Sequence, residues 1–293
     1  MIKPLTIGAA LSDQHLLGAA LGPTESWIGW LAVLKAAFAE TLTEQELVHF
    51  ATVAGDRPLP DKRVRELWAI VGRRGGKTRI AAAILTYLAV FVDHRSYLSP
   101  GETGYVLCLS LSKDQAELTH GYCRAFLEES PILRKEIVKV TQTEIELRNR
   151  ITISTHTNSF RTVRGRTIVA CVFDESAFWR DDSSANPDDE TYRAVLPALL
   201  TTKGMLVGIS SPYRRAGLLH TKHRDHYGNA SNEDVLRDLA RPIQLERYDL
   251  SRDGRLSALH TGKSPPGNGR RFASLSAHQP RSIVGPLLGC VTV

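Results

Sequence analysis

The sequence predicts an α/β fold in which a mostly parallel sheet is flanked by helices. Apolar strands and helices alternate from about residue 67 to residue 209, and this alternation is typical of parallel sheets. A glycine-rich turn joins the first of these strands to an apolar helix. The chain has 293 residues, 42% hydrophobic and 23% charged, which suits a globular protein with a large core and excludes disordered, collagen-like and coiled-coil classes.

The amino-terminal residues 1–41 predict a helical segment that contains a helix over residues 26–41. A second helix begins after Thr43, because a threonine followed three residues later by Glu46 is the capping-box pattern of a helix start. Residues 56–61, with two prolines, predict a connector. We expect the main domain to occupy residues 42–227.

Strands and helices then alternate within that domain, and a hairpin interrupts the alternation once. The predicted order is strand 67–71, helix 77–92, strand 105–110, helix 113–128, hairpin strands 144–147 and 151–155, strand 168–173, helix 189–199 and strand 205–209.

Residues 228–293 predict a basic tail that is truncated or atypical and poorly ordered. The chain has 37 Lys and Arg against 31 Asp and Glu, a net charge of +6, yet residues 254–293 contain five basic residues and no acidic one. The positive charge is therefore concentrated in the tail, and it is weak support for nucleic-acid binding by the main domain.

The cysteines and the apolar runs exclude several other classes. The four cysteines form no C-x-x-C pair and lie near no histidine cluster, so we expect no disulfide framework and no zinc site, as suits a reducing cytoplasm. The longest uncharged apolar run, residues 80–92, is shorter than the roughly 20 residues that span a bilayer. A core helix is expected there, and no membrane segment.

The strongest motif is the glycine-rich turn, a P-loop pattern. Its residues are Gly72, Arg73, Arg74, Gly75, Gly76, Lys77 and Thr78. Backbone N–H groups of such a turn converge on phosphates, the lysine reaches the terminal phosphates and the hydroxyl binds Mg²⁺. Val71 stands where the strict pattern has glycine, but the Gly-Lys-Thr end is intact. The alternative is a strand–helix turn with an incidental lysine; the strand–loop–helix context favours a nucleotide site.

Two further strands end in residues that could act beside such a loop. An apolar strand ends in Asp174 and Glu175, and carboxylates there could hold Mg²⁺ and polarise an attacking water. The next strand ends in Ser210 and Ser211, which could sense the γ-phosphate or form an ordinary Ser-Pro turn. The loop and the acidic strand together predict a nucleotide hydrolase.

Three arginines precede the acidic strand: Arg161, Arg164 and Arg166. An arginine near a triphosphate can stabilise the charge that develops during phosphoryl transfer, or it can contact a DNA phosphate. A solvated basic loop is the alternative, and for this segment it is favoured over a catalytic role.

The loop with paired arginines, the Arg-Gly step, the Asp-Glu-Ser-Ala segment 174–177 and the Ser-Ser-Pro strand end together resemble the ATPase domain of phage large terminases over residues 42–227. These proteins are the DNA-packaging motors of tailed bacteriophages. The resemblance implies a P-loop NTPase of the ASCE type, in which a catalytic glutamate stands beside the Mg²⁺-binding aspartate. It implies ATP and Mg²⁺ as cofactors, and an adenine-binding segment near residues 55–60.

The resemblance also implies a role for each motif residue. Lys77 and Arg73 would stabilise the transferred phosphoryl group, and Glu175 would activate water. Thr78 and Asp174 would hold Mg²⁺. Ser210 and Ser211 would couple hydrolysis to DNA movement. The expected partners are double-stranded DNA, the small terminase subunit, the portal protein and further copies in a ring on the portal, all in the bacterial host cytoplasm.

Large terminases also carry a nuclease domain, which requires a cluster of carboxylates around divalent metals. No acidic residue follows Asp253, so we predict that nuclease activity is absent and that the tail is truncated or out of frame. Two alternatives to a packaging ATPase stay open: a helicase-like ATPase, and an inactive prophage remnant that still binds nucleotide.

Overall fold

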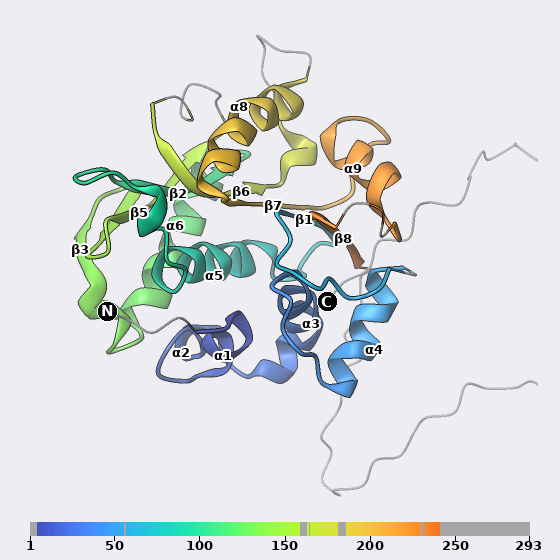
Figure 1. Cartoon of the computed structure of the whole chain (residues 1–293), viewed down its shortest axis with the longest axis horizontal. Coiled ribbons are helices and arrows are strands. Elements are labelled where there is room, and N and C mark those ends of the chain that lie inside the picture. The colour runs from blue at the N-terminus through green and yellow to red at the C-terminus, as the bar shows by residue number, and fades with distance from the viewer. Residues whose placement is uncertain are drawn as a thin grey trace, which may run out of the picture. The chain divides into compact units, whose positions relative to one another are not determined.

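The computed structural model describes residues 5–55, 57–158, 163, 165–180, 186–229, 231 and 233–240. Its centre is a single sheet of eight strands in the order β3-β4-β5-β2-β6-β7-β1-β8 (Figure 1). The strands are β1 (Glu66–Val71), β2 (Gly104–Ser110), β3 (Ile137–Val140), β4 (Glu144–Leu147), β5 (Ile151–Thr157), β6 (Thr167–Asp174), β7 (Met205–Ser210) and β8 (Val235–Ala240).

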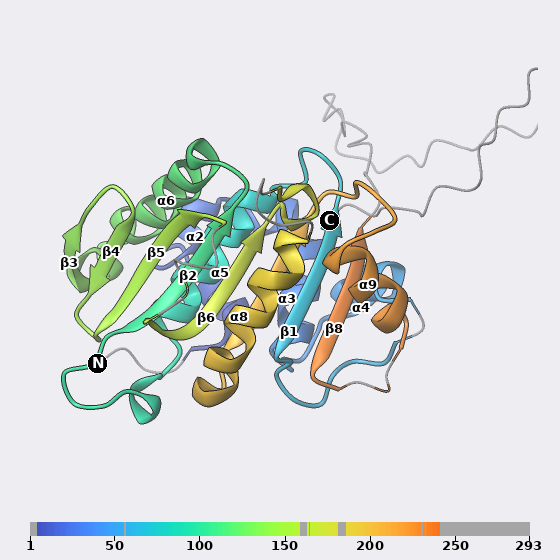
Figure 2. The same ribbon diagram turned by 90° about the horizontal axis from the view of Figure 1, so that it is seen from above.

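Helices cover both faces of this sheet. They are α1 (Ile7–Ser12), α2 (Gly18–Leu21), α3 (Ile28–Ala37), α4 (Glu44–Val53), α5 (Lys77–Val90), α6 (Lys113–Glu128), α8 (Pro187–Thr202) and α9 (Leu218–His226), with short 3₁₀ turns η1 (Thr24–Trp27), η2 (Arg95–Tyr97), η3 (Leu133–Glu136) and η4 (Ser176–Phe178). Helices α8 and α9 lie over one face, and α5, α6 and the amino-terminal helices lie over the other (Figure 2).

The six neighbouring strands β5, β2, β6, β7, β1 and β8 all pair in parallel with one another. Among the described strands, only the pairings of β4, with β3 and with β5, are antiparallel. Parallel strands covered on both faces are continuously apolar, and β1 is buried along its whole length. The prediction of a mostly parallel sheet between helices is confirmed.

Helix α5 lies between the sheet and the amino-terminal helices. Twelve of its residues are buried, since its sequence is apolar on almost every side and rich in alanine. Side chains of α1, α2 and α3 belong to the same core cluster as α5 and the sheet. The amino-terminal segment is therefore packed on the core of the α/β fold.

Several expected elements differ from the structure in their bounds. The helix expected over residues 26–41 is the 3₁₀ turn η1 followed by α3, and α3 ends at Ala37 because Ala39 takes a left-handed φ of 56°. The capping box at Thr43 and Glu46 is present. Strand β3 and helix α9 were not predicted, whereas α1 and α2 lie within the helical segment expected over residues 1–41.

The sheet also extends into the segment that was expected to be a poorly ordered tail. Strand β8 begins at Val235, beyond the expected boundary at residue 227, and pairs in parallel with β1 from Glu66 to Val71. The rest of that segment, from residue 241, lies outside the described residues. Among the described residues, no helix combines the length and apolarity needed to cross a membrane.

Candidate nucleotide site

The glycine-rich loop joins β1 to α5, as the sequence predicted. Arg74 and Gly76 both take left-handed conformations, with φ of 64° and 71°, so the loop curls back before the helix starts. Gly76 is the N-cap of α5, and a Cβ atom there would lie 2.4 Å from the Trp27 ring. Glycine is therefore required at position 76 by both its backbone conformation and its close approach to Trp27.

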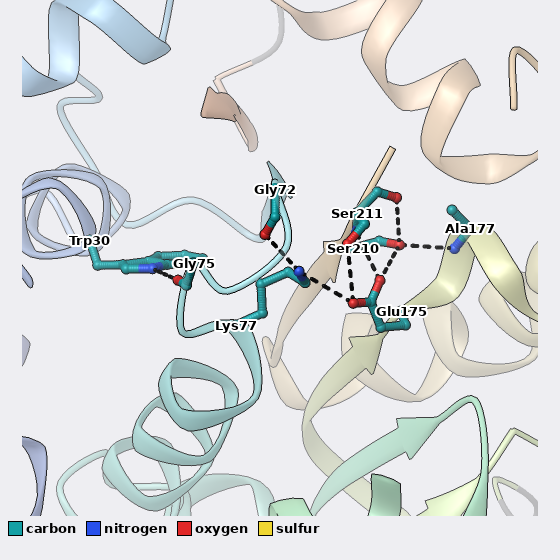
Figure 3. A network of polar contacts seen from close by, with 8 residues as sticks. All are labelled: Trp30, Gly72, Gly75, Lys77, Glu175, Ala177, Ser210 and Ser211. Atoms are coloured by element: carbon teal, nitrogen blue, oxygen red, sulfur yellow. Dashed lines mark hydrogen bonds and ion pairs between the residues drawn. The ribbon is translucent and has the colours of Figure 1, made fainter. Parts of the chain in front are cut away.

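Two tryptophans of the amino-terminal segment contact the last two glycines of this loop. The buried Trp30 donates a hydrogen bond from Nε1 to the Gly75 carbonyl oxygen at 2.8 Å (Figure 3). Trp27 packs against Gly76, and the Arg79 guanidinium lies 5.6 Å from the Trp27 ring centroid. No local sequence pattern links the tryptophans to the loop, since Trp30 and Gly75 are 45 positions apart.

Lys77, the first residue of α5, is 8% exposed and lies between two acceptors. Its Nζ donates to the Gly72 carbonyl oxygen at 2.9 Å and lies 3.4 Å from Glu175 Oε1. Figure 3 shows the ammonium group pointing out of the loop towards the acidic strand. The structure therefore brings together the loop lysine and the strand-end glutamate that the sequence singled out.

Asp174, the last residue of β6, is fully buried, and neither carboxylate oxygen has a partner within hydrogen-bond geometry among the described residues, although the nearby Gln115 side chain acts to lower the pKa of Asp174. Burial raises the pKa of Asp174 to about 7; the neighbouring Glu175 charge also raises this pKa, whereas Lys77 acts in the opposite direction. Buried carboxylate oxygens without partners suit a hard cation such as Mg²⁺. The residues present therefore fit a metal held by Asp174 with Thr78 at the start of α5.

Glu175 is fixed by the end of the neighbouring strand. It takes a left-handed conformation with φ of 54°, and its backbone N–H donates to the Ile209 carbonyl oxygen at 2.8 Å. Its carboxylate accepts hydrogen bonds from the Ser211 backbone N–H at 2.8 Å, the Ser210 hydroxyl at 3.1 Å and the Ser211 hydroxyl at 3.3 Å. Both serines therefore contact the glutamate directly (Figure 3).

The strand order explains this convergence. Strand β7 lies between β1 and β6, and all three run parallel, so their carboxyl ends meet at one edge of the sheet. The loop follows β1, the two carboxylates end β6, and the two serines end β7. Ligands of open α/β sheets bind outside such carboxyl ends.

The arginines divide into three groups. Arg73 and Arg74 are exposed on the loop, and their roles stay predictions. Arg161 and Arg164 lie outside the described residues. Arg166, which precedes β6, lies at the amino end of that strand, where its guanidinium contacts Glu144 at 3.2 Å and the Ser154 hydroxyl at 2.7 Å. A catalytic role for Arg166 is not supported, because the carboxylates stand at the other end of β6.

Comparisons with known proteins show similarity in fold but not in sequence. No family model matches the sequence, and no curated protein sequence matches it. The large terminase of bacteriophage HK97 is similar in structure, with 17% sequence identity and a TM-score of 0.50 over 70% of this chain. The match spans 40% of the HK97 protein. The ATPase domain of the Thermus phage P74-26 large terminase matches at 16% identity over 70% of this chain and 82% of that domain, with a TM-score of 0.43.

The architecture and the similarity to the HK97 protein agree with the family that the motifs resemble. The fold of this chain is therefore similar to that of the matched part of the HK97 large terminase, with the glycine-rich loop at the carboxyl edge of the sheet.

Proposed function

We propose that this chain is the ATP-hydrolysing motor part of a phage or prophage large terminase, which drives double-stranded DNA into a procapsid. The observation that carries the proposal is the continuous set of contacts from Lys77 to Glu175 and on to Ser210 and Ser211. It links the phosphate loop, the acidic strand and the strand that continues towards α9.

ATP would bind with its phosphates on the backbone N–H groups of the loop and on the α5 N-terminus. Lys77 and Arg73 would contact the terminal phosphates. Mg²⁺, held by Thr78 and Asp174, would neutralise phosphate charge when bound. The phosphate oxygens would compete with Gly72 and Glu175 for Lys77, which frees the glutamate.

Glu175 would then act as the general base. Its carboxylate takes a proton from water while the water oxygen attacks the γ-phosphorus, and the bond from that phosphorus to the β-bridging oxygen breaks to leave ADP and phosphate. A positioned base contributes roughly 10²–10⁴ to a rate. Because Ser210 and Ser211 bond to the same carboxylate, a change at Glu175 would move the end of β7 and couple hydrolysis to DNA movement.

The remaining assignments are part of the same proposal. The DNA duplex, the small terminase subunit and the portal protein would be the partners, with several copies of the chain in a ring on the portal, in the cytoplasm of the bacterial host. Nuclease activity would be absent. In such a ring, avidity would compensate for weak binding of each copy to DNA.

The test is ATP hydrolysis by the purified chain with and without Mg²⁺ and duplex DNA. We expect Mg²⁺-dependent turnover that falls by about 10²–10⁴ in Glu175→Gln, while that variant still binds ATP. Glu117→Gln is the matched control, since Glu117 lies on the exposed face of α6 with Lys113 as its ion-pair partner.

Three outcomes separate the candidates. Turnover in the wild type no greater than in Glu175→Gln, with ATP still bound, contradicts the motor and favours an inactive remnant. ATP-dependent strand separation of a duplex favours a helicase-like enzyme. Metal-dependent cleavage of plasmid DNA contradicts the predicted absence of a nuclease.

A further inference from the structure

An exposed surface of arginine and aromatic side chains lies beside the nucleotide site. We name it the Arg–Tyr surface and define it by Phe178, Arg180, Tyr213 and Arg214. The Arg180 guanidinium donates a hydrogen bond to the Tyr213 hydroxyl at 2.6 Å, and its carbon lies 6.0 Å from the Tyr213 ring centroid. The rings of Phe178 and Tyr213 are 4.6 Å apart.

The Arg–Tyr surface is formed by two chain segments, and each segment directly follows residues of the nucleotide site. Phe178 and Arg180 follow Glu175 through the single turn η4, and Tyr213 and Arg214 follow Ser211. The two segments are also joined at their start, because the Ala177 backbone N–H donates to the Ser210 hydroxyl at 3.3 Å (Figure 3). A displacement of Glu175 relative to Ser211 would therefore be passed to the Arg–Tyr surface.

The chemistry of the Arg–Tyr surface suits an anion. Arg180 and Arg214 are exposed, and no carboxylate of the described residues forms an ion pair with either of them. Tyr213 is 50% exposed, and its ring keeps the Arg180 guanidinium in place. Arginine forks match the geometry of phosphate oxygens, and tyrosine hydroxyls also bond to phosphates in protein–DNA interfaces.

We propose that the Arg–Tyr surface binds backbone phosphates of the DNA duplex and moves them when Glu175 and Ser211 change their contacts. The proposal rests on the proposed function, from which it takes the polyanion. An acidic protein is the other possible occupant. Arg180 and Arg214 give the surface two exposed positive charges with no ion-pair partner among the described residues, and guanidinium groups match phosphate oxygens. This composition favours the phosphate backbone.

The test measures binding of a short labelled DNA duplex by fluorescence anisotropy at several salt concentrations. Each phosphate contact contributes about 0.9 to the slope of log K against log salt. We expect the double variant Arg180→Gln/Arg214→Gln to bind more weakly and to lower that slope by about 1.8. Tyr213→Phe keeps the ring but removes the acceptor for Arg180, so it should show a smaller loss.

The control is Arg134→Gln/Lys135→Gln, which removes two exposed charges from η3 before β3, at the opposite end of the sheet from β8. It should leave the salt slope unchanged. ATP hydrolysis without DNA should stay the same in the Arg180/Arg214 variant, because neither residue belongs to the nucleotide site. Any acceleration by DNA should be lost.

A salt slope equal to that of the wild type would overturn the proposal, as would a wild type that hydrolyses ATP but does not bind the duplex. Tighter binding of a polyglutamate peptide than of DNA, lost in the same variant, would assign the surface to an acidic protein instead. Absence of ATP hydrolysis contradicts the proposed function, whereas the salt slope tests the surface separately.

Discussion

Two lysine–glutamate pairs lie at opposite ends of β1, and they differ in the distance between their charges and in the hydrogen bonds around them. At the start of the strand, Lys222 Nζ lies 2.6 Å from Glu66 Oε2, with both side chains almost buried. Glu66 also accepts hydrogen bonds from Trp68 Nε1 at 2.8 Å and the Tyr192 hydroxyl at 2.7 Å. The Lys222 ammonium lies 4.4 Å from the Tyr192 ring centroid.

The pair beyond the other end of β1 is looser. Lys77 Nζ and Glu175 Oε1 are 3.4 Å apart, and next to them the buried Asp174 has no hydrogen-bond partner among the described residues. A buried pair with every acceptor used holds elements together, here β1, α8 and α9. In the Lys77–Glu175 pair the charges are farther apart and the neighbouring Asp174 carboxylate is free to bind a ligand, so polar groups remain available there. The difference favours a structural role for the Glu66 pair and supports the functional role proposed for Lys77 and Glu175.

The largest expected effect is on stability, at the Glu66 pair. Lys222→Met leaves the Glu66 carboxylate buried without its cation, and breaking a buried pair in this way costs about 3–5 kcal/mol. Chemical denaturation monitored by circular dichroism measures the free energy of unfolding. Lys77→Met should cost much less, because Lys77 Nζ lies 3.4 Å from the Glu175 carboxylate, against 2.6 Å between Lys222 and Glu66.

The double variant Lys222→Met/Glu66→Gln is the control for this prediction. It removes both charges and should recover part of the stability lost in Lys222→Met. Equal destabilisation by Lys77→Met and Lys222→Met would show that the two pairs serve the same structural purpose.

The second prediction concerns the unpartnered carboxylate. Asp174→Asn removes a charge from a fully buried site and should stabilise the nucleotide-free protein by about 1–3 kcal/mol. It should also abolish Mg²⁺-dependent hydrolysis, which is the exchange of stability for activity typical of catalytic sites. Thermal unfolding and an ATPase assay measure the two effects on the same sample.

Asp225→Asn provides a comparison, since Asp225 pairs with Arg224 on the exposed side of α9. It should change stability by less than about 0.5 kcal/mol and leave hydrolysis intact. Destabilisation by Asp174→Asn would mean that the carboxylate has a structural partner after all.

The carboxyl end of β1, where the proposed nucleotide site lies, was easier to predict from sequence than the amino end. Gly76, Lys77, Asp174 and Glu175 stand in local patterns, each at the end of an apolar strand, so strand ends and residue type were enough to bring them together. The Glu66 pair joins positions 156 residues apart and has no local pattern. Lys222 occurs in a polar helix that was not predicted at all.

Two other features could not be read from the sequence because they depend on the order of strands. The placement of β7 between β1 and β6, which puts Ser211 within reach of Glu175, is a property of the whole sheet. Strand β8 is stabilised by pairing with β1, and its sequence Val-Leu-Arg-Asp-Leu-Ala resembles the polar segment around it. The predicted domain boundary at residue 227 therefore lies before β8, which begins at Val235.

The smallest expected effect is a change in ATP affinity when Trp30, which contacts the glycine-rich loop, is replaced. Trp30→Phe keeps a ring but removes the donor to the Gly75 carbonyl oxygen, which then stays buried without that bond. The loop should become less fixed, and ATP should bind about fivefold more weakly, equivalent to about 1 kcal/mol. Isothermal titration calorimetry measures this dissociation constant.

Trp68→Phe is the matched control, because Trp68 donates its Nε1 hydrogen bond to Glu66 and not to the loop. Both variants lose the same ring volume and should lower the melting temperature, so stability does not distinguish them. Only Trp30→Phe should change the affinity for ATP. If it destabilises the protein while ATP binds as tightly as to the wild type, Trp30 is a core residue, and the loop holds its phosphate-binding conformation through Arg74 and Gly76 alone.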